Sequence, residues 1–302
     1  MPRDEADMKS FQYLAPIAPF EYVVPSDMTE LLNILHDHGS DAKIISGGTD
    51  LTIALKQRLI KPKIIVDLNH IRGELSGITV EDGSLKIGAA TTYTEIEKDQ
   101  QINRYARALS QAASQVGTFQ IRNLGTIGAN LANGSPAADS APPLIALSAK
   151  IKVRSKQGLR DIQIEDFFTG VKKTVLCPDE IITAIEIPIK NKTSSSWMRF
   201  AKRNENVISV VSVAVSCEIN QGAFGESRIS LGAVAPTPIL AKESSSKLIG
   251  KIIDPETIEA AAKTAKNECK PISDVRGSAE YRRHLVYVLT KRTISQVANG
   301  IR

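Results

Sequence analysis

The stretch Ala42–Leu51, AKIISGGTDL, joins a short apolar strand to two glycines, which are followed by a hydroxyl and an acidic side chain. Because glycine has no Cβ, the backbone N–H groups of residues 46–49 can approach a ligand closely, and successive N–H groups can form a concave anion site. The alternative is a tight turn in which Asp50 caps the following segment. The stretch lacks the Walker lysine and the third glycine of the dinucleotide fingerprint, so a Rossmann-type site is not expected.

The sequence around this stretch predicts alternating helices and strands. Apolar side chains at helical spacing predict a helix over 26–38, with Asp27 three residues before Glu30 as a capping box and Gly39 as the stop. Short β-branched segments predict strands over 42–45 and 63–68. Further elements are a hairpin over 78–89, whose Asp82-Gly83 pair suits a turn with positive φ, and helices over 92–98 and 102–116.

The second half of the sequence also mixes strands and helices. We expect a hairpin over 151–164, strands over 181–189, 197–203, 207–219 and 227–235, and helices over 254–268 and 278–298. Asp254 would cap the first of these helices, with Pro255 in its first turn. The polar segment NKTSSSW (191–197) is interpreted as a linker or an exposed turn. The overall pattern predicts an α+β protein with a domain boundary near residue 190.

A second glycine-containing segment lies between two apolar elements. Residues 117–144 show neither helical nor alternating periodicity, and we predict a long functional loop there. Gly125–Asn130 offers small residues, a threonine hydroxyl and a side-chain amide. Asp139 either caps the next helix or accepts a hydrogen bond from a ligand. Two Gly/Thr loops in one chain suit a long ligand with contacts at both ends, such as a dinucleotide.

Composition narrows the class of protein. With 302 residues, 42% hydrophobic and 24% charged, the chain can bury one or two cores. Apolar runs are too short for a membrane span, and the acidic start is unlike a secretory signal, so we expect a cytoplasmic protein. The bases are scattered despite the net charge of +5, which argues against nucleic acid as a partner. The three cysteines are widely spaced, and no local nucleophile or metal motif is present.

Three segments together resemble a known family. They are AKIISGGTDL (42–51), QIRNLGTIGANLANGSPAADSAPPLIAL (120–147) and SDVRGSAEYRRHLVYVLTKR (273–292). In this order and spacing they are similar to the FAD-binding medium subunit of the molybdenum hydroxylases, the xanthine dehydrogenase and carbon monoxide dehydrogenase family, and most of all to the FAD subunit of bacterial xanthine dehydrogenase-type enzymes. The segments DGSLKIGAATTYTEIE (82–97) and GAVAPTPI (232–239) fit the same pattern.

The resemblance implies a fold and a cofactor site. The implied fold is α+β, with an FAD-binding domain of the vanillyl-alcohol-oxidase type over 10–190, divided into two subdomains near residue 70, and a smaller α+β C-terminal domain over 195–300. It also implies which residues contact FAD: Ile44, Ile45, Ser46, Gly47, Gly48, Thr49, Asp50 and Leu51 in the first loop, Thr126, Ile127, Gly128, Ala129 and Asn130 in the second, Asp139 beyond it, and Ile182 and Met198 as apolar contacts to the flavin.

The implied function is electron transfer within a larger enzyme. An iron–sulfur small subunit would pass electrons from a molybdenum-cofactor large subunit to FAD in this chain, and NAD+ or another acceptor would receive them. One departure from the family pattern is Ala129, which replaces the second glycine of T-x-G-G-N and would be strained if that position needs positive φ. Two alternatives are a cofactor-free assembly module of the same fold and a stand-alone flavin oxidase.

Overall fold

The structure, a computed structural model, describes residues 16–190 and 192–300, so residues 10–15 of the expected FAD-binding domain lie outside the described residues.

The first sheet consists of parallel strands that carry the opening glycine stretch at one end. The sheet has the order β1-β3-β2. Its strands and the helices around it are β1 (Glu21–Val23), α2 (Met28–His38), the 3-10 turn η1 (Gly39–Asp41), β2 (Ala42–Ile45), α3 (Leu51–Lys56), β3 (Ile64–Asp67) and α4 (Arg72–Leu75).

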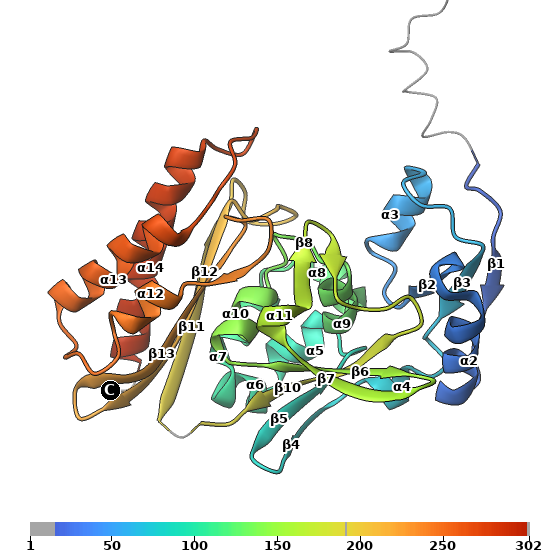
Figure 1. Ribbon diagram of the computed structural model, residues 1–302, viewed down its shortest axis with the longest axis horizontal. Helices are drawn as coiled ribbons and strands as arrows, with labels where there is room; N and C mark the ends of the chain where they lie inside the picture. Colours follow the sequence, from blue (N-terminus) through green and yellow to red (C-terminus); the bar gives the residue numbers. More distant parts are fainter. Residues whose placement is uncertain (1–15, 191, 301–302) are drawn as a thin grey trace, which may run out of the picture.

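A second, antiparallel sheet of five strands follows in the order β4-β5-β10-β6-β7. Its strands are β4 (Ile78–Glu81), β5 (Ser84–Gly88), β6 (Lys150–Ser155), β7 (Gly158–Gln163) and β10 (Ile181–Pro188). The accompanying helices are α5 (Tyr93–Lys98), α6 (Gln100–Tyr105), α7 (Arg107–Ala113), α8 (Phe119–Leu124), α9 (Ile127–Ala132), α10 (Ala141–Ala146) and α11 (Ile164–Phe167), with a small β8 (Phe168–Gly170) and β9 (Lys173–Thr174) hairpin. Figure 1 shows these helices gathered on one side of the sheet.

A third sheet with its own helices forms the C-terminal part of the chain. It has the strand order β11-β12-β13-β14. Its elements are β11 (Thr193–Phe200), β12 (Val211–Asn220), β13 (Ala223–Gly232), β14 (Ile239–Leu240), α12 (Lys242–Ser246), α13 (Pro255–Glu268) and α14 (Ala279–Asn299). Helices α13 and α14 cover one face of this sheet, while α7 and α10 contact the other (Figure 1). Each of the three sheets has a separate hydrophobic core.

Local signals account for most of the predicted elements. The Asp27 carboxylate accepts a hydrogen bond of 2.8 Å from the Glu30 N–H at the start of α2, and Gly39 ends that helix at φ 48°. Glu30 itself accepts from Ser26 rather than from Asp27, so the capping box is only half formed. Asp82 and Gly83 have φ values of 48° and 74°, as a two-residue hairpin turn requires.

Three predictions about the chain organisation are wrong. The predicted loop over 117–144 contains α8, α9 and the start of α10, and the predicted helix over 102–116 is broken at Ala106. The segment 193–197, expected as a linker or turn, belongs to β11, while residue 191 lies outside the described residues. Short helices of six residues are marginal alone and depend on tertiary contacts, so their periodicity is too brief to recognise in the sequence.

The centre of β11, residues 195–197, is buried, and its two serine hydroxyls bond to α7. The Ser195 hydroxyl accepts from the Ala108 N–H at 3.1 Å, and the Ser196 hydroxyl donates to the Gln111 side chain at 3.2 Å. The Trp197 side chain, 2% exposed, lies in a cluster with alanines of α7, α10 and β12. These contacts join α7, which packs on the second sheet, to the C-terminal sheet. Among the described residues, no helix has the length and apolarity needed to cross a bilayer.

Candidate functional site

The connection from β2 to α3 presents a row of backbone donors. Among the described residues, none of the N–H groups of residues 46–51 finds an acceptor, and the first bonded N–H is that of Thr52, which donates to the Gly48 carbonyl at 3.1 Å. Gly48 adopts φ 67°, a conformation that suits glycine. Six consecutive N–H groups without partners at the start of a helix make this connection a candidate site for an anion.

The second glycine segment packs directly against the first. A Cβ on Gly47 would lie 1.8 Å from the carbonyl oxygen of Leu124 at the end of α8. The Thr126 hydroxyl donates to the Ser46 hydroxyl at 3.3 Å. Gly47 is therefore required because another part of the backbone passes it closely, and the two loops that the sequence placed 80 residues apart form one site.

A third segment, which sequence reasoning did not assign to the site, supports the second loop. The N–H groups of Ile127 and Gly128 donate to the carbonyls of Thr91 and Ala89, at 3.1 and 2.8 Å. A Cβ on Gly128 would lie 2.6 Å from the Ala89 Cβ. The signal in the sequence was the run of small residues GAATT at 88–92, directly after β5. A close approach of two backbones requires small side chains on both.

Ala129 is not strained. It lies inside α9 and is absent from the residues with positive φ among those described, so its backbone is one that alanine adopts readily. Its side chain is exposed. The strain expected for alanine at this position depended on a positive φ, and the helical backbone removes that condition.

Asn130 is oriented by a buried chain of hydroxyls. The Ser140 hydroxyl donates to the Asn130 side-chain oxygen at 2.7 Å, and the Tyr93 hydroxyl donates to Ser140 at 3.3 Å. Burial raises the pKa of Tyr93, so its hydroxyl stays protonated. Within residues 16–190 and 192–300 the Asn130 amide nitrogen has no acceptor, which leaves it available as a donor to a ligand.

Asp139 has partners in the C-terminal sheet. Its carboxylate oxygens accept from the Arg199 guanidinium at 2.8 Å and from the Ser209 hydroxyl at 2.6 Å, and both members of the ion pair are buried. Burial raises the pKa of Asp139, whereas Ser209 and Arg199 act to lower it. Ser140, not Asp139, is the N-cap of α10, so the helix-capping interpretation is wrong. The structure gives Asp139 a role in joining two parts of the chain.

The two apolar candidates are placed differently. Ile182 is 4% exposed in the core of the five-stranded sheet, and its neighbour Thr183 accepts a hydrogen bond of 3.0 Å from the Ala89 N–H, so it adjoins the third segment. Met198 lies on the α14 side of β11, in a groove with Tyr287 and Arg292. The structure does not bring Met198 together with the glycine loops.

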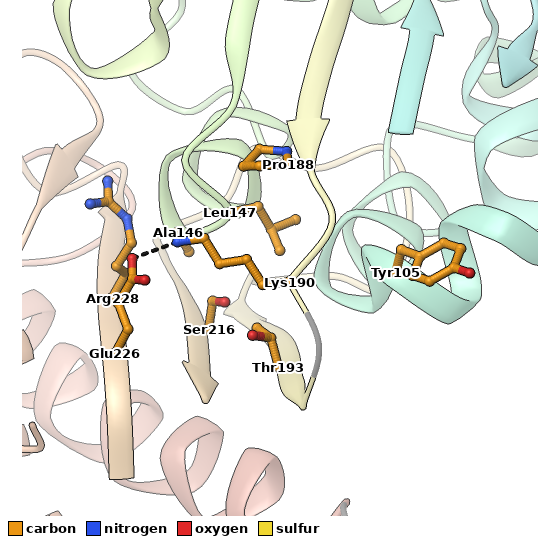
Figure 2. Close-up of a pocket in the computed structure, with 9 residues that line it drawn as sticks. All are labelled: Tyr105, Ala146, Leu147, Pro188, Lys190, Thr193, Ser216, Glu226 and Arg228. Atoms are coloured by element: carbon orange, nitrogen blue, oxygen red, sulfur yellow. Dashed lines mark hydrogen bonds and ion pairs between the residues drawn. The ribbon is translucent and has the colours of Figure 1, made fainter. Parts of the chain in front are cut away.

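Another small cleft lies where β10 leads to the C-terminal sheet (Figure 2). Its charged lining residues are Lys190, Glu226 and Arg228. Lys190 lies 2.6 Å from the Glu226 carboxylate, and Arg228 donates to Glu165 and to a carbonyl of α10. Each of these three charged side chains therefore already has a partner within the cleft or beside it.

The glycine loops fit one kind of ligand. Unpartnered N–H groups, with the hydroxyls of Ser46, Thr49 and Thr126 beside them, suit phosphate oxygens. Asn130 adds a donor from the second loop. Within residues 46–51 and 125–130 Asp50 is the one acid, and it is exposed, while Asp139 beyond them is already paired. The arrangement can bind and orient a phosphorylated ligand, and residues 46–51 and 125–130 contain no histidine, cysteine or lysine.

Comparison with known proteins agrees with this geometry. Residues 18–190 match the FAD binding domain in molybdopterin dehydrogenase, and residues 196–297 match the CO dehydrogenase flavoprotein C-terminal domain. The chain is 37% identical over 272 residues to the xanthine dehydrogenase FAD-binding subunit of Escherichia coli O157:H7, covering 89% of this chain and 92% of that protein. It is 33% identical over 288 residues to the nicotinate dehydrogenase FAD-subunit of Eubacterium barkeri, covering 93% and 97%.

Solved structures share the whole fold. A chain of carbon monoxide dehydrogenase from Hydrogenophaga pseudoflava superposes with a TM-score of 0.90 at 30% identity, covering 94% of this chain and 98% of that chain. A chain of quinoline 2-oxidoreductase from Pseudomonas putida 86 superposes with a TM-score of 0.89 at 30% identity, covering 95% and 99%. The α+β fold expected from the sequence is confirmed, as is FAD as the cofactor of the domain. The chain belongs to the FAD-binding subunits of the molybdenum hydroxylase family.

Proposed function

We propose that this chain carries electrons as the flavoprotein subunit of a molybdenum hydroxylase complex. Its partners are an iron–sulfur small subunit and a large subunit with a molybdenum cofactor. When bound, FAD supplies the redox chemistry, because it accepts electrons one at a time from iron–sulfur clusters and releases them in pairs to an acceptor such as NAD+. The residues of this chain bind and orient the cofactor.

The observation that carries this proposal is the row of unpartnered N–H groups at residues 46–51. We assign these groups, with the Ser46 and Thr49 hydroxyls, to the diphosphate of FAD. Asn130 donates from the second loop, where Ser140 fixes the orientation of its amide. Asp139 and Arg199 hold the C-terminal sheet against this region. Ile182 lies next to Thr183, whose carbonyl holds the segment 88–92 that packs against the second loop. Met198 has no part in the proposed diphosphate site.

Substrate selectivity lies in the partners under this proposal. The matched relatives and structures are named for different substrates, including xanthine, nicotinate, carbon monoxide and quinoline, although their chains are 29–37% identical to this one. Their shared fold supports a shared task that does not depend on the substrate. We propose xanthine dehydrogenase-like activity for the whole complex, because the chain is 37% identical to the Escherichia coli subunit and 33% identical to the nicotinate dehydrogenase subunit.

The alternatives make different predictions. A cofactor-free assembly module had Ala129 as its main support, and the helical backbone at that position removes it. A stand-alone flavin oxidase needs a base at the reacting end of the flavin, and the free carboxylate of the two glycine loops, Asp50, lies in the loop that we assign to the diphosphate.

Anaerobic reduction of the purified complex separates these possibilities. We expect the visible flavin absorption to bleach when NADH is added, and again when xanthine is added to the complete complex. Bleaching by simple alcohols without partner subunits would support the oxidase. A complex without flavin absorption, even after incubation with FAD, would support the assembly module and contradict the proposal.

A further inference from the structure

Three exposed apolar side chains project from one end of the C-terminal sheet. Val275 is 90% exposed, Ile272 69% and Ile208 52%. We call these three residues the apolar knob. They belong to the β11–β12 connection and the α13–α14 connection, which touch where the Lys202 ammonium donates to the Val275 carbonyl at 2.6 Å. In Figure 1 both connections lie at the same upper end of the molecule as α3 and α8.

The backbone beneath the apolar knob is firmly held. Asp274 and Gly277 exchange two N–H···O hydrogen bonds of 3.1 Å, and the Arg276 N–H donates to the Asp274 carboxylate at 2.8 Å. Arg282, with a side chain 4% exposed, donates to the same carboxylate at 2.7 Å and to main-chain carbonyls beside β12 and β13. A buried arginine that holds a turn with an exposed valine at its tip gives a preorganised contact surface, which lowers the entropic cost of binding.

The surroundings of the apolar knob are basic. Lys202 and Arg203 are exposed on the β11–β12 connection, where Glu205 is the exposed acid. On the other connection the single carboxylate of Asp274 pairs with both Arg276 and Arg282, which leaves one positive charge in excess. An apolar centre with a charged rim has the anatomy of a protein interface. A second copy of this chain, with a net charge of +5 and the same rim, is a poor occupant.

The apolar knob is connected to the cofactor site. The Ser209 hydroxyl, next to Ile208, donates to Asp139 at 2.6 Å. The Asn206 N–H donates to the Gly117 carbonyl at 3.0 Å, just before α8. A protein seated on the apolar knob would therefore lie beside the segments that carry the second glycine loop. Electron transfer requires such closeness between donor and acceptor.

We propose that the apolar knob is the docking point of the iron–sulfur subunit, which receives Val275 in an apolar pocket with an acidic rim. Iron–sulfur clusters are held by cysteine thiolates, and the net negative charge of such a centre complements the basic rim. This inference rests on the proposed function, because it names where the electron-donating partner of that function binds.

The test uses the complex expressed with all its subunits. Val275→Glu places a charge at the centre of the apolar knob, and Leu159→Glu, at a side chain 75% exposed in the β6–β7 hairpin, is the matched control. We expect Val275→Glu to weaken binding of the iron–sulfur subunit by about tenfold or more, as at an interface hot spot, and Val275→Ala to weaken it less. Leu159→Glu should retain the subunit. Thermal unfolding of each variant chain checks that the fold is intact.

The possible outcomes separate the docking proposal from the proposed function. Retention of the iron–sulfur subunit by a folded Val275→Glu variant would overturn the docking proposal. The same holds if that variant keeps its partner but raises the KM for NADH, since the apolar knob would then face the electron acceptor. If the unaltered chain never purifies with an iron–sulfur polypeptide, the proposed function itself fails. In that case there is no complex for Val275→Glu to weaken.

Discussion

The carbonyl oxygen of Leu124 lies 1.8 Å from the position that a Cβ on Gly47 would occupy. This relationship joins two glycine loops that are far apart in the sequence. Glycine is needed at position 47 because the absent side chain makes room for the second loop. The N–H groups of residues 46–51, which have no acceptor among the described residues, therefore lie beside that loop.

Gly47→Ala should separate the two loops. The Cβ cannot coexist with the Leu124 carbonyl, so the backbone must shift, at a cost of about 1–3 kcal/mol in the free energy of unfolding. The row of N–H groups would lose its alignment, and FAD occupancy should fall strongly. Flavin absorbance per protein and urea unfolding measure the two effects.

Gly73→Ala is the matched control for this variant. A Cβ at Gly73, inside α4, meets no atom within 4 Å, and its φ is not positive. Stability should stay the same or rise slightly, because alanine favours a helix. Full FAD occupancy in Gly47→Ala would contradict the role given to the contact between the loops.

Ala129→Gly restores the family pattern but should bring no gain. Because Ala129 is an exposed residue in α9, glycine there should lower the free energy of unfolding by about 0.5–1 kcal/mol. FAD affinity should not increase. A titration of the apoprotein with FAD, compared between the two proteins, checks this, and a tighter complex in the glycine variant would show that Ala129 does weaken the site.

Breaking the buried pair of Asp139 and Arg199 should be costly. Arg199→Gln leaves an unpaired buried carboxylate, and such a loss costs about 3–5 kcal/mol. The double variant with Asp139→Asn should recover part of this loss, because the uncompensated charge is removed. Chemical unfolding of the two single variants and the double variant gives the coupling energy. Strictly additive effects would mean that the pair is not coupled.

Acid should weaken the turn below the apolar knob. Although burial alone would raise it, hydrogen bonds from the Arg276 N–H and the Arg282 guanidinium lower the pKa of Asp274 to about 2. Because folding lowers this pKa, the ionised Asp274 stabilises the folded chain fully at pH values above the aspartate pKa of the unfolded chain. The stabilisation is lost as the pH falls through the pKa of Asp274 in the folded chain. The stabilisation from Asp274 should therefore disappear between about pH 5 and pH 2.

Asp274→Asn provides the comparison for this pH dependence. The variant should be less stable than the unaltered chain at neutral pH, and the difference in stability should shrink as the pH approaches 2. Thermal unfolding of both proteins across this range measures it. A constant difference at every pH would show that the charge of Asp274 does not contribute.

The features that the sequence predicted correctly depend on neighbouring residues. Asp27 and Gly39 bound α2, and Asp82 with Gly83 forms the turn between β4 and β5, because caps and two-residue turns are local interactions. The strand β2 was predicted in the same way, while the role of the glycine stretch after it in binding FAD stays a prediction. The predicted boundary near residue 190 depends on composition and on the resemblance, and it stays a prediction.

The features that were missed depend on contacts between distant residues. The support of Gly128 by Ala89, and the pairing of Asp139 with Arg199, join segments that are 39 and 60 residues apart. No local pattern specifies such a partner. The helices α8 and α9 were missed for a related reason, since each is stabilised more by its neighbours than by its own sequence.

The most direct test of the account is an experimental structure of the complex with FAD bound. We predict that the diphosphate oxygens accept hydrogen bonds from N–H groups of residues 46–51, with the second loop against the same nucleotide. A structure in which the diphosphate is held by another segment, while these N–H groups face solvent or protein, would contradict it.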